Sequence, residues 1–143
     1  MTNTIRHIGI VVEDQEKSLV FWRDLLGFTV YADNLEKGSF IDCILDRAST
    51  TVRTIKLRDT KNQCIELLHF QSHSNNSSKP STLFTPGITH IALQVSDVHK
   101  TVSRLKDSGY KSLSEPQIAP NHLATVVFII GPENLYLELV ELN

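Results

Sequence analysis

The sequence predicts an α+β fold built from two β-α-β-β-β modules, because the 143-residue chain repeats one order of elements in its two halves. An apolar, strand-like run that carries a histidine occurs early in each half, at His7 and at His90. A second apolar run that carries a glutamate occurs late in each half, at Glu66 and at Glu138. Internal repeats indicate the architecture before any single residue is interpreted, so this duplication determines the predicted fold.

In the first module, residues 4–12 alternate with a period of two, which predicts a strand with His7 and Val11 on one face. Asp14 is placed to cap the helix that follows, and Gly27 is placed to end it. The helix is expected at 14–26, and the remaining strands are expected at 28–32, 51–57 and 63–70.

The second module repeats this order after a polar segment. Asp97 lies seven positions after His90, as Asp14 does after His7, and is again placed to cap a helix. The sequence predicts a strand at 88–95, a helix at 97–108 and strands at 110–114, 123–130 and 135–142. We assign residues 1–143 to one domain that consists of module one at 1–71, a linker at 72–87 and module two at 88–143.

The two modules differ in length. Glu66 lies 59 positions after His7, whereas Glu138 lies 48 positions after His90. The excess falls at 38–48, where apolar residues recur at helical spacing and Ser39 is able to cap. We interpret this insert as a short helix that forms a wall or lid of a pocket, with a hydrophobic plug or a dimer contact as the alternative.

Composition excludes several classes of protein. A formal net charge of −2 argues against nucleic acid or an anionic membrane as a partner, and no apolar run is long enough to span a membrane. The two cysteines, Cys43 and Cys64, are too few for a disulfide framework or a structural zinc site. We therefore expect a cytoplasmic protein.

Two histidines and two glutamates at equivalent positions are the donor set that a divalent metal site between two modules requires. Each glutamate lies in an apolar run, where an unpaired buried carboxylate would be strongly disfavoured. We expect one divalent metal ion, either Zn, Ni, Co, Mn or Fe, bound by His7, Glu66, His90 and Glu138. The alternative is a pair of buried Glu–His hydrogen bonds without a metal.

The chain resembles the vicinal oxygen chelate superfamily, which includes glyoxalase I, extradiol dioxygenases and bleomycin-resistance proteins. The resemblance covers nearly the whole chain and rests on six segments: His7 to Val12, Phe21-Trp22, Leu26-Gly27-Phe28, Ile65-Glu66-Leu67, His90 to Leu93, and Gly131-Pro132-Glu133 leading to Leu137-Glu138-Leu139. It implies that the modules form a U-shaped cup of mixed sheet around the metal held by the four residues. It also implies a small-molecule substrate and a homodimer.

The resemblance further implies a metal-dependent lyase or isomerase that transfers a proton next to a chelated carbonyl or hydroxyl pair, with Glu66 or Glu138 as the base. Related dioxygenases generally use two histidines and one glutamate, so an acidic fourth ligand at Glu66 favours proton-transfer chemistry. A ferrous-iron dioxygenase and a non-enzymatic binding protein of the bleomycin-resistance type are the alternatives.

Four further residues are expected to contact the substrate. Glutathione-using relatives place an arginine and an asparagine where this chain has Val11 and Phe70, which makes the predicted pocket more apolar. Gln94 is the repeat equivalent of Val11 and adds one polar contact, and Tyr136 shares the face of Glu138. No residue identifies the substrate itself.

Overall fold

The computed structural model describes residues 2–74 and 82–143, and the chain divides into two compact units, Met1–Ser78 and Lys79–Asn143. The sequence-based linker at 72–87 is only partly covered, because residues 75–81 lie outside the described residues. Each unit contains one mixed sheet with few helices, so the predicted α+β fold is confirmed. In the described part of the chain, no helix is long and apolar enough to cross a membrane.

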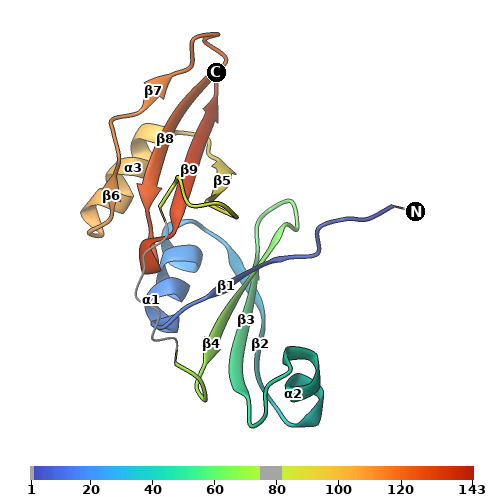
Figure 1. The fold of residues 1–143 in the computed structure, drawn as a ribbon. Coiled ribbons are helices and arrows are strands. Elements are labelled where there is room, and N and C mark those ends of the chain that lie inside the picture. The colour runs from blue at the N-terminus through green and yellow to red at the C-terminus, as the bar shows by residue number, and fades with distance from the viewer. Residues whose placement is uncertain (1, 75–81) are drawn as a thin grey trace. The chain divides into compact units, whose positions relative to one another are not determined.

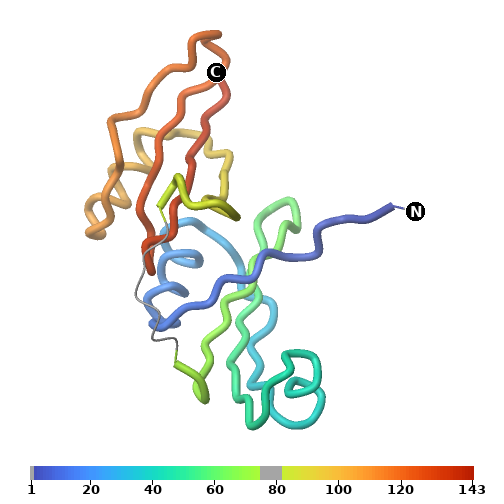
Figure 2. Tube along the Cα trace, in the orientation of Figure 1, coloured from blue at the N-terminus to red at the C-terminus, as the bar shows by residue number. Residues whose placement is uncertain are grey.

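The first unit is a four-stranded sheet in the order β1-β4-β3-β2 (Figure 1). The first strand pairs in parallel with β4, far along the chain, and Figure 2 shows the two running together. The other two pairings are antiparallel. In chain order, the elements of this unit are β1 (Ile8–Val11), α1 (Gln15–Leu19), a π-helical segment (Val20–Leu25), β2 (Thr29–Lys37), α2 (Ser39–Leu45), β3 (Thr51–Arg58) and β4 (Cys64–Phe70).

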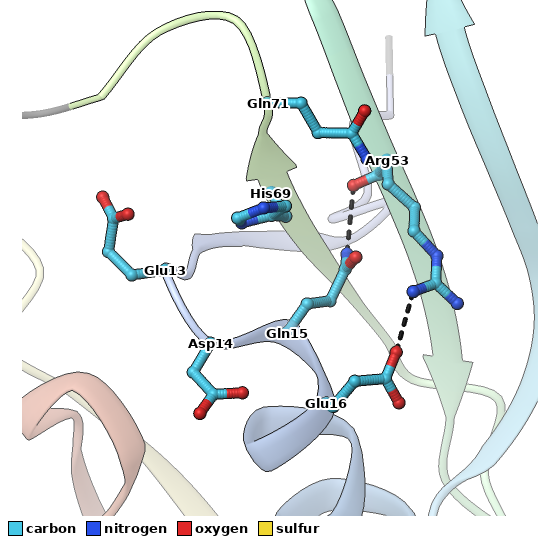
Figure 3. Close-up of a pocket in the computed structure, with 7 residues that line it drawn as sticks. All are labelled: Glu13, Asp14, Gln15, Glu16, Arg53, His69 and Gln71. Carbon is cyan, nitrogen blue, oxygen red and sulfur yellow. Dashed lines mark hydrogen bonds and ion pairs between the residues drawn. The ribbon is translucent and has the colours of Figure 1, made fainter.

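Helix α1 covers one face of this sheet. The Gln15 side-chain amide donates to the backbone carbonyls of Arg53 at 3.0 Å and Leu67 at 3.3 Å. The Arg53 guanidinium also lies 2.8 Å from a Glu16 carboxylate oxygen, so the Arg53 side chain points toward the helix (Figure 3). The face that carries Arg53 is therefore the packed one, and Ile55 and Leu57, which lie on the same face, are fully buried.

The helix after β1 differs from the expected continuous α-helix over 14–26. It begins as predicted, with the Asp14 carboxylate accepting from the Lys17 backbone N–H at 2.9 Å. It continues as a π-helical segment, in which the Leu26 N–H donates to the Phe21 carbonyl five residues earlier. Phe21 and Trp22 are both buried there, and Gly27 ends the segment with φ of +78°.

The insert forms a helix, α2, as the sequence predicts, but Ser39 does not cap it. The helix starts at Ser39 itself, and the preceding Gly38 has φ of +105° and no capping side chain. The polar contact comes instead from Asp42, whose carboxylate accepts from the backbone N–H groups of Ser49 and Thr50. This carboxylate fixes the return of the chain into β3.

The second unit repeats the order of the first, with β5 parallel to β9 and the remaining pairings antiparallel. Helix α3 packs on this sheet (Figure 1) and is capped by Asp97, which accepts from the Lys100 N–H at 2.8 Å. The elements are β5 (His90–Gln94), α3 (Val98–Asp107), β6 (Lys111–Ser112), β7 (Gln117–Ile118), β8 (Ala124–Ile130), a 3-10 turn (Pro132–Asn134) and β9 (Tyr136–Leu142).

The predicted strand at 110–114 is wrong in extent. Only Lys111 and Ser112 pair with β8, and a second short strand, Gln117–Ile118, pairs with β8 further along. Pro116 separates the two pieces, and a proline removes a ladder donor and interrupts a continuous strand.

Asp33 provides a pH-dependent contribution to stability. Arg53 donates two hydrogen bonds to its carboxylate, at 2.9 and 2.8 Å, and holds the pKa of Asp33 below its ordinary value. The folded-state pKa is then lower than the unfolded value of about 3.9, so this stability is present above about pH 4 and is lost as the pH falls through the folded-state pKa.

We expect Asp33→Asn to lower the free energy of unfolding at pH 7 by no more than about 1 kcal/mol, because both side chains are partly exposed. The difference in the free energy of unfolding between the variant and the wild type should shrink once the pH falls below about 4. Urea denaturation at both pH values measures this, and a difference that stays constant with pH would contradict it.

Candidate metal-binding site

In the first unit, His7 and Glu66 form a close pair. The His7 Nε2 lies 2.8 Å from a Glu66 carboxylate oxygen, and the side chains are 34 % and 9 % exposed. The pair arises from the parallel strand register, in which Gly9, two residues after His7, is opposite Glu66. The parallel register therefore brings His7 and Glu66 together on one face of the sheet.

In the second unit, His90 and Glu138 form the equivalent pair. The His90 Nε2 lies 3.2 Å from a Glu138 carboxylate oxygen, and the side chains are 35 % and 26 % exposed. Ala92, two residues after His90, is opposite Glu138, which is the same register as in the first unit. The repeat thus extends from the sequence to the hydrogen-bonded pairing of the strands, while the second glutamate is the more accessible one.

The two pairs have suitable donor chemistry for a divalent metal ion, but each is incomplete. Imidazole nitrogen and carboxylate oxygen are donors for Zn, Ni, Co, Mn and Fe. Within the residues that the structure describes, no group of three or more His, Cys, Asp or Glu side chains is close enough to hold an ion. Each unit therefore offers two donors, one imidazole nitrogen and one carboxylate oxygen.

The residue opposite each glutamate differs between the units. Phe128 on β8 is opposite Glu138, and its ring packs edge-on against the His90 ring, with centroids 5.2 Å apart. Lys56 on β3 is opposite Glu66. The same register position is thus aromatic in one unit and cationic in the other.

A contact that the sequence does not reveal lies beside Glu66. The Tyr31 hydroxyl is 2.8 Å from the Cys64 thiol, and the Arg58 guanidinium stacks over the Tyr31 ring at 4.8 Å from its centroid. The hydrogen bond to Cys64, followed by burial, raises the pKa of Tyr31 above its ordinary value. Tyr31 reaches this position through a β-bulge between Val30 and Ala32, and no sequence pattern predicts that bulge.

The structure brings together two of the four residues expected to contact substrate. Val11 and Phe70 line one pocket of about 540 Å³ in the first unit, and Leu45 of α2 lines it too. The insert therefore lines this pocket through Leu45 and Arg47, whereas neither His7 nor Glu66 lines it. In the second unit, Gln94 is exposed and Tyr136 is half-buried beside His90 in the strand register.

A second pocket, of about 590 Å³, lies on the helix face of the first unit (Figure 3). Glu16, Arg53 and His69 line it, and the ion pair between Glu16 and Arg53 crosses it. Arg53 and His69 are opposite each other in the strand register, on the face that does not carry Glu66. This pocket contains none of the sequence-predicted site residues.

The chain is similar to known proteins along its whole length. The model of the Glyoxalase/Bleomycin resistance protein/Dioxygenase superfamily matches residues 4–139, and the chain belongs to that superfamily.

A probable lactoylglutathione lyase of Synechocystis is 26 % identical, with 94 % of this chain and 92 % of the relative covered. The mitochondrial methylmalonyl-CoA epimerase of Mus musculus is 28 % identical, over 97 % of this chain and 71 % of the relative.

Solved structures share the fold. A glyoxalase family protein from Bacillus cereus has a TM-score of 0.92 at 19 % identity, over 99 % of this chain and 95 % of the other. A fosfomycin resistance protein from Listeria monocytogenes, complexed with Mn(II) and sulfate, has a TM-score of 0.63 at 15 % identity, over 100 % and 95 %.

Proposed function

We propose that the protein is a divalent-metal-dependent lyase or isomerase, including epimerases, whose metal ion is bound by His7, Glu66, His90 and Glu138. The observation that carries this proposal is the pair of equivalent His–Glu contacts, 2.8 Å in one unit and 3.2 Å in the other, at the same strand register. Two neutral imidazoles and two carboxylates balance the charge of one divalent cation. The ligands come from both units, either of one chain or of two chains in a homodimer.

The metal-free alternative, two Glu–His hydrogen bonds alone, explains the contacts less well. Hydrogen bonding stabilises a buried carboxylate such as Glu66, which is 7 % exposed. It gives no reason for the same pair to occur at the more accessible Glu138 and at the same register. A role as ligands of one metal ion explains both the accessibility of Glu138 and the equal strand register of the two pairs.

When bound, a divalent ion in such a site stabilises negative charge that develops on two neighbouring substrate oxygens. The chain supplies the proton transfer. Glu138 is the better placed base, because its side chain is 26 % exposed, compared with 9 % for Glu66, and so is more accessible to a substrate. Val11 and Phe70 provide apolar contacts, and Gln94 and Tyr136 provide polar ones.

The superfamily relatives support proton-transfer chemistry over oxygen chemistry. Those named as a probable lactoylglutathione lyase and a methylmalonyl-CoA epimerase cover most of this chain. The unpaired thiols Cys43 and Cys64 fit a reducing compartment, and we propose a cytoplasmic location.

Metal analysis of protein purified without added metal tests the proposal. We expect close to one divalent ion for every chain, and deuterium exchange from D₂O into 2-oxo or hydroxy-ketone compounds without oxygen uptake. Oxygen consumption that depends on ferrous iron would favour a dioxygenase instead. No binding of Ni, Co, Mn or Zn at neutral pH would favour a non-enzymatic binding protein.

A further inference from the structure

Two cations lie on the same sheet face as the His7–Glu66 pair. Lys56 is directly opposite Glu66, and Arg58 is opposite Cys64, two residues before Glu66 on the same strand. Directly opposite residues in an antiparallel pair have Cβ atoms about 4.5–5.5 Å apart. Arg53, on the same strand, alternates with these residues and points to the helix face.

These two cations have no ion-pair partner among the residues that the structure describes. Within residues 2–74 and 82–143, neither Lys56 nor Arg58 forms an ion pair, whereas Arg53 contacts both Asp33 and Glu16. Charged residues often protect an exposed edge strand, but β3 is an inner strand, paired on both sides. Edge protection therefore does not explain why β3 carries these two cations at this position.

The Arg58 side chain is held in place. Its guanidinium stacks on the Tyr31 ring at 4.8 Å, and Tyr31 is anchored by the Cys64 thiol at 2.8 Å. Stacking uses the flat face of the guanidinium and leaves the N–H donors at its edge free. Those donors suit two parallel hydrogen bonds to a carboxylate or phosphate.

The second unit shows that these register positions flank the candidate ligands. Phe128, at the position equivalent to Lys56, contacts the His90 ring. Ile130, at the position equivalent to Arg58, is opposite Tyr136. The second unit thus has apolar residues where the first has cations, so charge at these positions is not a requirement of the repeated fold.

We propose that Lys56 and Arg58 bind an anionic group, a carboxylate or a phosphate, of the substrate whose neighbouring oxygens reach the metal ion. This inference rests on the proposed function and adds the substrate class to it. Lys56 supplies a compact positive charge beside Glu66, and Arg58 supplies oriented hydrogen-bond donors. Recognition of the anion places the reacting carbon within reach of the candidate base.

Three hydroxamates, which chelate metals through two neighbouring oxygens, test the proposal on the metal-loaded protein. Acetohydroxamate has no further charge, succinate monohydroxamate adds a carboxylate, and phosphonoacetohydroxamate adds a phosphonate. We expect a charged probe to bind the wild type about tenfold or more tightly than acetohydroxamate, as measured by calorimetry. The more favoured charged probe identifies a carboxylate or a phosphate as the natural group.

Lys56→Gln and Arg58→Gln should each reduce this advantage, which is the ratio of charged-probe affinity to acetohydroxamate affinity in the same variant, to about threefold or less. Lys37→Gln is the matched control, because Lys37 is an exposed cation whose partner Thr51 lies on the helix face of β3. Lys37→Gln should keep the full affinity advantage of the charged probe over acetohydroxamate. Equal affinity of all three probes for the wild type, or an undiminished advantage of the charged probe in both single variants, would overturn the inference while leaving the metal site intact.

Failure of acetohydroxamate to bind the metal-loaded wild type would instead count against the proposed function. Anion binding by Lys56 and Arg58 is then tested on the metal-free protein with inorganic phosphate as the probe. Phosphate should shift the side-chain NMR signals of Arg58 in the wild type, and Lys56→Gln should weaken that response. Unchanged signals at saturating phosphate would overturn the inference independently of any metal.

Discussion

Replacing Glu66 by glutamine is expected to weaken divalent metal binding by at least about 100-fold. The variant keeps the shape of the side chain but loses the negative charge and the stronger donor, and loss of outer-shell partners alone costs 10- to 100-fold in comparable sites. Glu138→Gln should have an effect of similar size, because the two glutamates have the same strand register. Calorimetric titration with Ni or Co measures the affinity.

The free energy of unfolding of the metal-free protein distinguishes loss of a ligand from misfolding. Glu66 is a buried carboxylate, so glutamine is expected to leave the metal-free protein as stable as the wild type. Glu36→Gln is the matched control, since Glu36 lies on the same face, opposite Val52, and contacts Thr54 rather than a histidine. Unchanged metal affinity in Glu66→Gln or in Glu138→Gln would show that the residue is not a ligand.

Trp22→Ala is expected to destabilise the first unit by about 3–5 kcal/mol, because it deletes a large buried side chain and leaves a cavity. Trp22 is 1 % exposed and packs edge-on against Phe21 and Phe28, with ring centroids 5.7 and 5.0 Å away. A loss of this size is a large fraction of the stability of an ordinary domain. Urea denaturation followed by circular dichroism provides the measurement.

Val20→Ala is the control for the same π-helical segment. Val20 is 44 % exposed, and we expect a change within about 0.5 kcal/mol. A Trp22→Ala variant that unfolds at the same urea concentration as Val20→Ala would contradict the assignment of Trp22 to the core.

Much of the fold is predictable because burial leaves a periodic trace in the sequence. Residues 4–12 alternate with a period of two, and Asp14 and Asp97 lie where a helix needs a cap. Both His–Glu pairs follow from the repeat, because equivalent strands in the two halves pair in the same register. The α2 insert is predictable from the break in that repeat.

Other features depend on contacts between distant residues. The spacing of the apolar residues does not distinguish an α-helix from the π-helical segment at Phe21 and Trp22, because both kinds of helix bury one apolar face. The extension of β2 to Lys37 depends on pairing with β3, since its charged residues lower the strand propensity. The contact of Tyr31 with Cys64 requires a bulge, which leaves no periodic signal.

X-ray absorption of the cobalt-loaded protein tests whether one metal ion binds both histidines, because it reports the number of imidazoles bound to each ion. We expect one cobalt for every chain, with two imidazole nitrogens and with oxygen donors in the remaining positions. His7→Gln and His90→Gln should each remove one imidazole contribution. Two cobalt ions for every chain, each with a single imidazole, would show that the His–Glu pairs act separately and would contradict the shared site.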